Sequence, residues 1–337
     1  MSKLVSLSVI LCLSFNCFAQ ISDSIYSTPY YVKMNNSLNL RLDFDNDVRS
    51  FEFQRILNDY SIQPNIKLRT AVALNYRFIS VKIGYSPRFL AKNDYELKGK
   101  TKVFNIEFDF FISDWMQTFQ YRNVKGYYTQ QIEDPQFFMS YMEDEYIKLP
   151  ELRTLYIGGT TRYRFNENFS YKAVVNQNEI QLKSTGSFVP SLNYGYAEIT
   201  DKTFPKDMKT ISVILTTGYF YTFVFSKHWY SNLGINPGVG IEFHKTITRL
   251  DDKVTNTRHN NLGFNLGSHI GLGYNSKKVY GGFLLIGNAY TRDEKSLVKY
   301  ENVRGYFKIF IGYRFRAPKS FEKGMDWVDN KNPFKKK

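Results

Sequence analysis

Near its end the chain alternates strictly between apolar and polar residues. In 303–316, VRGYFKIFIGYRFR, one face holds Gly305, Phe307, Ile309, Ile311, Tyr313 and Phe315, and the other holds Arg304, Lys308, Arg314 and Arg316. A strand that is apolar on one face, cationic on the other and terminated by an aromatic residue is typical of the last strand of an outer-membrane β-barrel. We therefore expect the chain to close a barrel here.

Similar alternating segments recur along the whole chain. The expected strands are 38–44, 68–78, 81–85, 104–112, 115–121, 155–165, a seventh that begins at Phe169, 210–226, 233–243, 261–275, an eleventh after 275–278 whose facing the pattern does not assign, and 303–316. Long connections, at 46–65, 87–100, 123–150, 180–209, 246–260 and 291–300, alternate with short turns. This predicts an all-β fold, a transmembrane antiparallel up-and-down β-barrel of about 12 strands (about 12 to 14), with short periplasmic turns and long extracellular loops. A soluble β-sandwich or lipocalin-like barrel is the alternative, but neither needs this asymmetry.

One segment could be interpreted as a transmembrane helix instead of a strand. The run 210–226, TISVILTTGYFYTFVFS, carries no charge and is almost long enough to span a bilayer as a helix. Its β-branched and aromatic residues, the internal Gly218, and the polar turn at Lys227 and His228 favour a strand.

The two ends of the chain differ from the barrel. Residues 1–19 predict a cleaved signal peptide, with Lys3 followed by an apolar run and Ala19 before the cut. Residues 20–35 are expected to form a periplasmic N-terminal segment, 36–316 the barrel and 317–337 a basic periplasmic tail. Cys12 and Cys17 both lie in the signal peptide, so we expect no disulfide in the mature chain.

Composition and charge agree with a wall between lipid and water. The chain has 26 Tyr and 29 Phe, yet its mean hydropathy is −0.39, as expected when every second residue faces water. The formal net charge is +14. Basic proteins often bind nucleic acid, but export makes that partner unexpected. Outer-membrane lipids and anionic solutes are the expected partners.

The polar faces of the expected strands point into the lumen and carry many charges. The lumen-lining candidates are Arg41, Lys67, Arg69, Arg77, Lys82, Glu107, Asp109, Arg162, Arg164, Glu242, Lys308 and Arg314. Two interpretations remain open. Charges of both signs could pair across a filled, rigid lumen, or the cations could line an open channel that prefers anions. Inward glycines on the ninth and tenth strands indicate curvature or the close approach of another backbone, such as a loop folded into the lumen.

Several segments resemble a known family. The segments FSYKA at 169–173 and QLKSTGS at 181–187 resemble the hallmark of a domain-of-unknown-function family of exported proteins from Gram-negative bacteria. Pro64 with Asn65, the stretch 76–81, and Gly126 with Tyr127 and Tyr128 are similar to its earlier blocks, so the resemblance covers most of the mature chain. It implies an outer-membrane barrel without an established activity, and it assigns no catalytic or ligand residue.

The sequence contains no standard catalytic signature. It has no GxSxG, P-loop, HExxH or CxxC motif. An outer-membrane lipid hydrolase needs a Ser and a His on one face, but Ser268 and His269 lie on opposite faces, and Ser226 and His228 sit at a periplasmic turn. We therefore expect no catalytic residue and no cofactor, and we regard a lipid-modifying hydrolase as the least favoured function.

A metal site is a weak alternative at one hairpin. His244 and His259 flank a loop that contains Asp251 and Asp252, and pairing of the two strands would bring the imidazoles together. Polar residues at the neck of a solvated loop explain the same pattern more simply. We expect no metal ion.

Two further segments carry expectations about partners and passage. Gln181, Lys183, Ser184, Gly186 and Ser187 lie in the long connection 180–209, which we expect to fold back from the outside and narrow the lumen. The tail carries Trp327 and Phe334 among cations, and it is either a solvated tail or a docking peptide for a periplasmic or peptidoglycan-associated partner. The barrel-insertion machinery is expected to recognise the closing strand at Phe315.

The sequence thus favours a non-enzymatic channel or passage for small solutes, anionic ones included, or lipid. A structural or assembly component of the outer membrane with a filled lumen is the alternative.

Overall fold

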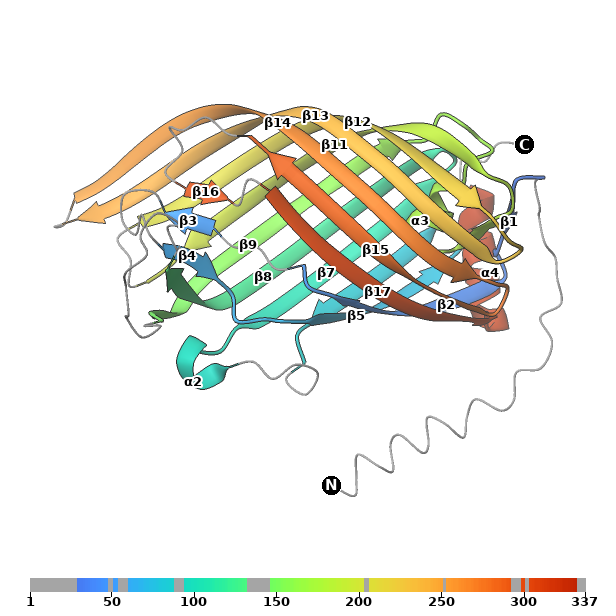
Figure 1. Ribbon diagram of the computed structural model, residues 1–337, viewed down its shortest axis with the longest axis horizontal. Coiled ribbons are helices and arrows are strands. Elements are labelled where there is room, and N and C mark those ends of the chain that lie inside the picture. The colour runs from blue at the N-terminus through green and yellow to red at the C-terminus, as the bar shows by residue number, and fades with distance from the viewer. Residues whose placement is uncertain are drawn as a thin grey trace, which may run out of the picture.

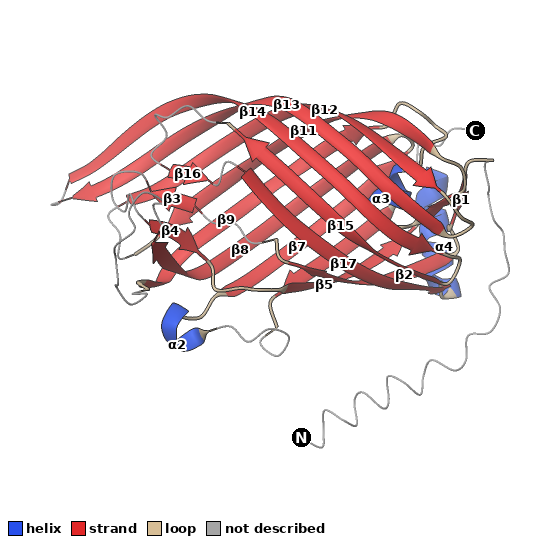
Figure 2. Ribbon diagram, viewed as in Figure 1, coloured by secondary structure: helices blue, strands red, loops and turns tan. Residues whose placement is uncertain are grey.

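Twelve antiparallel strands close into a barrel (Figures 1 and 2). The computed structural model describes residues 29–47, 51–53, 60–87, 94–131, 146–202, 206–250, 253–291, 298–300 and 303–331. The barrel strands are β2 (Ser37–Asp45), β5 (Arg69–Tyr76), β6 (Ile79–Tyr85), β7 (Lys102–Ile112), β8 (Trp115–Gln131), β9 (Lys148–Tyr163), β11 (Thr185–Thr200), β12 (Lys206–Val224), β13 (Trp229–Leu250), β14 (Lys253–Asn275), β15 (Val279–Tyr290) and β17 (Val303–Arg316). The predicted signal peptide and most of the expected N-terminal segment lie outside the described residues.

Closure occurs where the first and last barrel strands meet. β17 pairs with β2, with Phe315 opposite Leu38 and Lys308 opposite Asp45. The expected closing strand is therefore confirmed. Closure satisfies the backbone groups that an open edge would expose to lipid.

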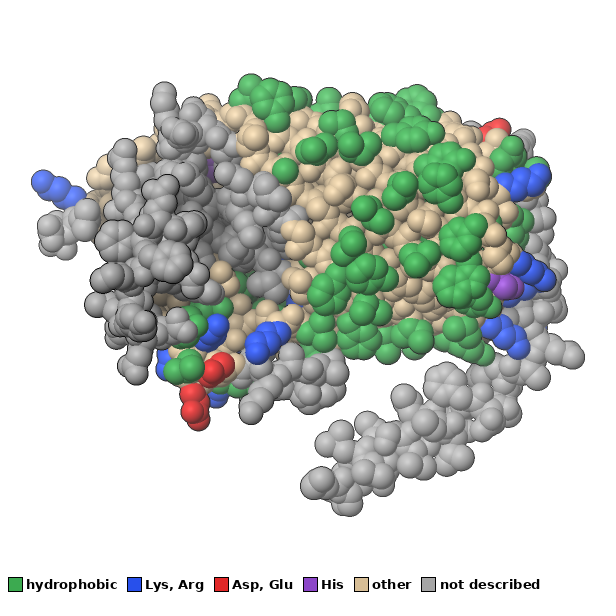
Figure 3. All heavy atoms as spheres, viewed as in Figure 1, with side chains coloured by type: hydrophobic (Ala, Val, Ile, Leu, Met, Phe, Trp, Pro, Cys, Tyr) green, Lys and Arg blue, Asp and Glu red, His purple; other side chains and the backbone are tan. Residues whose placement is uncertain are grey.

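The outer and inner surfaces follow from the period of two along each strand. Apolar side chains such as Leu262 (67% exposed) and Ile235 (53% exposed) cover the outside, whereas Asn232, Asp43 and Arg314 are buried on the inside. In Figure 3, apolar side chains spread over the barrel wall, and Lys and Arg side chains lie at its two ends. The wall therefore presents an apolar outer surface to lipid.

The tightest turns and the longest loops lie at opposite ends, but the expected strict alternation is wrong. The connection 164–184, on the side of the turns, is long, and the expected loop 246–260 mostly belongs to β13 and β14. One end has the turns and both barrel termini, together with β1 (Tyr31–Lys33), β10 (Glu179–Gln181), α3 (Tyr171–Val175) and α4 (Lys319–Lys331) (Figure 1). The other end has α2 (Tyr95–Lys98) and a small ribbon of β16 (Val298–Tyr300), β3 (Phe51–Phe53) and β4 (Tyr60–Gln63) that extends β8. By the asymmetry of the connections, the first end is periplasmic and the second extracellular. None of the described helices is long and apolar enough to span a bilayer.

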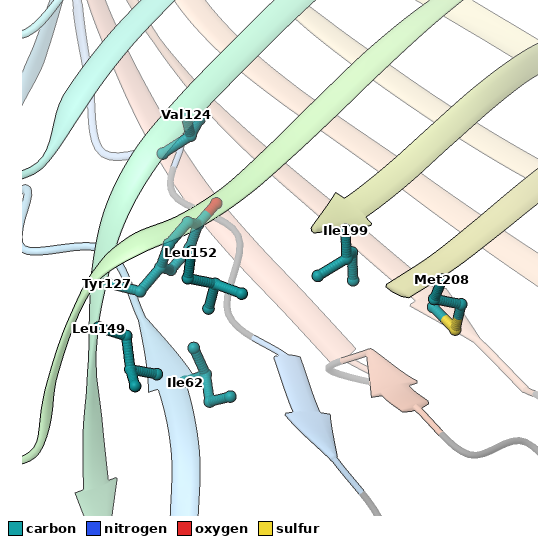
Figure 4. Close-up of a cluster of buried hydrophobic side chains, with 7 residues drawn as sticks. All are labelled: Ile62, Val124, Tyr127, Leu149, Leu152, Ile199 and Met208. Carbon is teal, nitrogen blue, oxygen red and sulfur yellow. The ribbon is translucent and has the colours of Figure 1, made fainter. Parts of the chain in front are cut away.

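Apolar side chains pack inside the barrel near the extracellular end. Figure 4 shows this cluster, which joins β4, β8, β9, β11 and β12 and consists of Ile62, Val124, Tyr127, Leu149, Leu152, Ile199 and Met208. One side of the interior is therefore apolar near the extracellular end.

The predicted seventh strand is wrong, although the number of barrel strands is right. Phe169 opens a segment that forms α3, and the strand that follows β9 is β11, in the region expected to be an extracellular loop. Ser170 ends the extended chain because its Oγ accepts a hydrogen bond from the Ala173 N–H at 3.0 Å and caps the helix. The segment 181–187 consequently lies at the periplasmic end and not in an outer loop.

The inward glycines make room for large side chains of neighbouring strands. A Cβ at Gly234 would collide with the ring of Phe220, and one at Gly273 would collide with the ring of Tyr230. The aromatic rings fill the space that the glycines leave and hold the strands in register. At Gly238 and Gly263 the atom nearest to such a Cβ is a backbone carbonyl oxygen, of Leu215 and Thr291, so the expected close approach of another backbone also occurs.

Candidate functional site

A short segment enters the lumen from the periplasmic end and forms a plug, here defined as residues 169–181. Its apolar residues Phe169, Tyr171 and Val174 are buried against Phe111 and Met116 of the wall and further residues of the same cluster, Val189 and Phe220. Residues Asn176–Gln181, which follow the helix, are all buried. The plug therefore fills the barrel at this level.

Polar side chains of the wall hold the plug in place. Arg41 of β2 donates hydrogen bonds to the Val175 carbonyl at 2.9 Å and to Gln177 Oε1 at 2.8 Å. Asn275 of β14 donates to the Glu179 carbonyl at 3.1 Å. Because buried polar groups are costly when unpaired, these bonds give the plug one position in the lumen.

Arg314 of the closing strand makes the most buried of these contacts. Its side chain is 0% exposed, and its guanidinium donates to the Gln177 carbonyl and, at 2.8 Å, to Asn275 Oδ1. The guanidinium also lies 4.3 Å from the centre of the Tyr280 ring, which is a cation–π contact. Arg314, an expected lumen-lining residue, therefore contacts the plug and not an open channel.

The N-terminal segment clamps the plug from the periplasmic side. β1 and β10 form a two-stranded antiparallel sheet with Val32 opposite Ile180. Gln181 Nε2 donates to the Tyr30 carbonyl at 3.0 Å, and the Leu182 N–H donates to the same carbonyl at 2.7 Å.

An internal ion pair stabilises the fold of the plug itself. Glu179 accepts a hydrogen bond from Ser170 Oγ at 2.6 Å and lies 3.7 Å from Lys172 Nζ. Burial lowers the pKa of the Lys172 ammonium, and the charge of Glu179 opposes that effect.

A cavity of about 410 Å³ lies on the extracellular side of the plug. Tyr171, Val174 and Val175 of the plug line it on one side. Its charged lining consists of six cations and four carboxylates: Arg41, Arg69, Lys82, Arg122, Arg162, Lys308, Asp45, Asp47, Glu107 and Asp109. A smaller, mainly apolar cavity of about 70 Å³ shares Asp47, Arg69 and Arg122 with it.

Most of the lining charges are paired. Lys82 Nζ lies 2.6 Å from Glu107 Oε1, and Arg69 lies 2.6 Å from Asp45 Oδ1. Arg122 reaches Asp47 Oδ2 at 2.7 Å. The first two pairs link neighbouring strands, and the third joins β8 to the segment after β2, which is not its neighbour in the sheet. The filled-lumen interpretation expects such pairs.

Two cations face the cavity without a carboxylate at ion-pair distance among the described residues. Arg162 of β9 donates to Thr118 Oγ1 at 3.1 Å, and Lys308 of β17 lies among the lining residues. Asp109 likewise has no cation at ion-pair distance among the described residues, and Arg41 is paired with Asp43 beside the lining. Six cations and five carboxylates therefore leave an excess of one positive charge, which favours anions in the cavity.

The structure distributes the twelve expected lumen residues over several environments. Seven line the cavity: Arg41, Arg69, Lys82, Glu107, Asp109, Arg162 and Lys308. Arg314 contacts the plug, Arg164 and Arg77 lie near the periplasmic end with Asp114 and Asp326 as ion-pair partners, and Glu242 lies 3.3 Å from His244. Lys67 is exposed on the connection before β5.

Most of the residues expected to form a constricting loop, within 181–187, are not the ones that fill the lumen. Gln181 belongs to the plug, and Lys183 and Ser184 are exposed just after it. Gly186 and Ser187 belong to β11. A segment does fold into the lumen, but it comes from the periplasmic end and its core is 169–181.

Sequence reasoning missed Arg122, Asp45, Asp47 and the plug residues 176–178. The period of two identifies Arg122, because it shares its face of β8 with Thr118 and Gln120. No periodicity marks Asn176, Gln177 and Asn178. Gln177 has a φ of 55°, a left-handed conformation that turns the chain back toward the wall.

The two histidines of the long hairpin do meet. His244 and His259 are register partners with stacked rings 4.7 Å apart, and Thr210 Oγ1 lies 2.9 Å from His244 Nδ1. Asp251 and Asp252 lie outside the described residues. Within the described part of the chain, no group of three or more His, Cys, Asp or Glu side chains is arranged to hold a metal ion.

The tail beyond the barrel forms α4. Asp326 lies 2.7 Å from Arg77 of the turn between β5 and β6, and the Phe321 ring contacts Tyr76 edge-on at 5.4 Å. Trp327 is 60% exposed. Phe334 lies outside the described residues.

Known structures with a similar outline include outer-membrane proteins. OmpT of Vibrio cholerae shares 8% identity at a TM-score of 0.32, covering 87% of this chain and 100% of its own. The β domain of the Bordetella autotransporter BrkA shares 11% at 0.39, covering 84% and 100%. The Ralstonia pickettii toluene transporter TbuX shares 9% at 0.31, covering 87% and 90%. These values are too low to transfer an activity.

Comparison with protein families gives a clearer result. No curated protein matches the sequence. One family model matches residues 22–315, which include the plug and the barrel up to Phe315. The chain therefore belongs to the family described as Domain of unknown function (DUF4421).

Proposed function

We propose that this protein is a non-enzymatic outer-membrane passage that admits small anionic solutes from outside and is held shut toward the periplasm by its plug. The observation that carries the proposal is the cavity of about 410 Å³, which has a net positive lining that includes Arg162 and Lys308 and is bounded by the plug. A cationic cavity concentrates anions, and the plug prevents their free diffusion.

The polar character of the plug supports a movable barrier. Its contacts with β2, β14 and β17 are hydrogen bonds through Arg41, Asn275 and Arg314. Exchange of such bonds for bonds to water costs about 1.5–3 kcal/mol net where the donor is a charged Arg and about 1 kcal/mol where it is an amide. The apolar packing of Phe169, Tyr171 and Val174 on the wall adds to the cost of displacement. Displacement of the plug is nevertheless much less costly than opening of the barrel wall.

Planar-bilayer conductance tests the proposal. The wild type should be closed with rare openings. A barrel in which 171–180 is replaced by a Gly-Ser linker should conduct steadily and prefer anions. Silence of that plug-deleted barrel at high protein load would contradict the passage.

A reversible lock provides a second, independent measurement. Asn39 of β2 and Asn178 of the plug are in direct side-chain contact, so N39C/N178C is expected to form a disulfide that fixes the plug. Because the mature chain is expected to contain no other cysteine, the pairing is unambiguous. The oxidised variant should lose the rare openings, and reduction should restore them. If the oxidised and the reduced variant open equally often, the plug is not the gate.

A structural role is the second candidate. The ion pairs Lys82–Glu107, Arg69–Asp45 and Arg122–Asp47 favour it because they join different segments of the wall inside the lumen. It gains support if both the wild type and the plug-deleted barrel remain silent while loss of the protein weakens the envelope.

A further inference from the structure

Three cations stand side by side on the outer surface of the barrel at its extracellular end. Lys102 of β7 is directly opposite Lys125 of β8, which is directly opposite Arg153 of β9. They continue the outward series of their strands, in which Phe104 is 46% exposed and Ile157 is 49% exposed. The three side chains therefore face the lipid side.

A second row repeats this arrangement farther around the wall. Lys209 of β12 is opposite Lys245 of β13, which is opposite Arg258 of β14. Ile211, 53% exposed, and Phe243, 42% exposed, continue the same outward faces toward the membrane. The two rows belong to different strands, so they are independent examples of one pattern.

Each row lies on the extracellular side of outward apolar residues of its strands. Immediately toward the membrane, Phe104, Asn123 and Leu155 follow the first row, and Ile211, Phe243 and Asn260 follow the second. Residues two positions apart in a strand are separated by about 7 Å. Each cation row thus sits just above the apolar surface that contacts lipid chains.

Directly opposed like charges destabilise a sheet, and each row has only one carboxylate at ion-pair distance among the described residues. Glu151 lies 3.0 Å from Lys125, and Glu198 lies 3.1 Å from Lys209. Two positive charges per row remain without an anion. An external anion would relieve the repulsion.

We propose that the two rows bind the phosphate groups of an anionic lipid in the outer leaflet. Each row pairs Lys side chains, which act as point charges, with one Arg that can hold a phosphate through two parallel hydrogen bonds. The apolar side chains below accommodate the acyl chains of the same lipid. A free phosphate ion would not need that apolar surface.

Retention of a defined lipid by the full-length protein tests the proposal. Purified barrel in detergent is titrated with diphosphorylated lipid A, and bound lipid is counted by native mass spectrometry. K102Q/K125Q/R153Q and K209Q/K245Q/R258Q should each lose one class of bound lipid. Each cation near a charged membrane surface strengthens lipid binding about fivefold. Loss of three cations should therefore weaken the binding of that lipid about 100-fold in each triple variant.

A matched variant controls for net charge. K227Q/K277Q/K278Q removes three exposed cations from the periplasmic turns and should bind lipid A like the wild type. Heat-modifiable migration on a gel verifies that every variant is folded. The proposal is overturned if the row variants retain wild-type binding, if the control loses as much as they do, or if dephosphorylated lipid A binds equally well. Competition by inorganic phosphate at similar concentration would also overturn it, because it would indicate a free-ion site.

Discussion

At the scale of single residues, backbone conformation limits what the sequence can reveal. Gly126 has a φ of 89° and lies at an irregularity in the pairing of β8 with β9, between Lys125 and Tyr127. A Cβ there would overlap with the Lys100 carbonyl oxygen. The sequence pattern places Gly126 in the expected connection 123–150, whereas β8 continues through it to Gln131. The carbonyl that requires a glycine there comes from another segment.

We expect Gly126→Ala to destabilise the barrel. The left-handed conformation costs about 1–2 kcal/mol for a residue with a side chain, and the overlap with Lys100 adds to that. Gly305→Ala is the matched control, because nothing lies within 4 Å of a Cβ at Gly305. Samples are incubated at increasing temperatures and run on a gel without boiling. The temperature at which the compact, folded band disappears should be lower than in the wild type for G126A but not for G305A. Equal temperatures would mean that the chain around Gly126 adapts without cost.

At the scale of elements, the period of two predicts most of the barrel but not its seventh strand. The segment 169–173 alternates like a strand, yet a single cap at Ser170 makes it helical. The true strand, β11, contains Pro190, which weakens the strand pattern. Proline is tolerated there because pairing with β9 begins only at Ser191, so its missing N–H breaks no bond to that neighbour. The plug was not predictable because its contacts with Arg41 and Arg314 join residues more than 130 positions apart.

The closing strand should matter more for assembly than the tail. Phe315 lies opposite Leu38 where β17 pairs with β2. Phe315→Asp removes the terminal aromatic residue and places a charge near the membrane–water interface, at a cost of roughly 1 kcal/mol. Removal of 317–337 eliminates the exposed Asp326 contact with Arg77 and leaves the barrel strands intact. We expect F315D to lower the amount assembled in the outer membrane much more than the truncation does. The opposite ranking would show that α4 is required for the folded body.

At the scale of the whole molecule, the charge pattern of the lumen was predictable but its net effect was not. Seven of the twelve expected residues line one cavity because the strand period sets their facing. Which of them remain unpaired depends on neighbours that the sequence does not identify, such as Asp47 for Arg122.

Lys308→Met should lower the anion preference of the plug-deleted barrel. A unit charge at close approach in water is worth about 1 kcal/mol to an ion, so the ratio of anion to cation permeability should fall by up to about fivefold. The reversal potential in a salt gradient measures this ratio. Lys227→Met, at an exposed periplasmic turn, is the control and should leave it unchanged. An unchanged ratio in K308M would place the ion path away from Lys308.

The contacts of the plug with β2 and β17 also bear on the order of folding. Asn39 lies on the first barrel strand and Arg314 on the last, and both touch the plug, at Asn178 and at the Gln177 carbonyl. Pairing of the first and last strands joins the most distant parts of the chain and is therefore a slow step. If the plug enters first, it presents partners to both strands and favours their meeting. The plug-deleted barrel should then reach its compact, heat-modifiable form more slowly, because the two strands must find each other without a shared template.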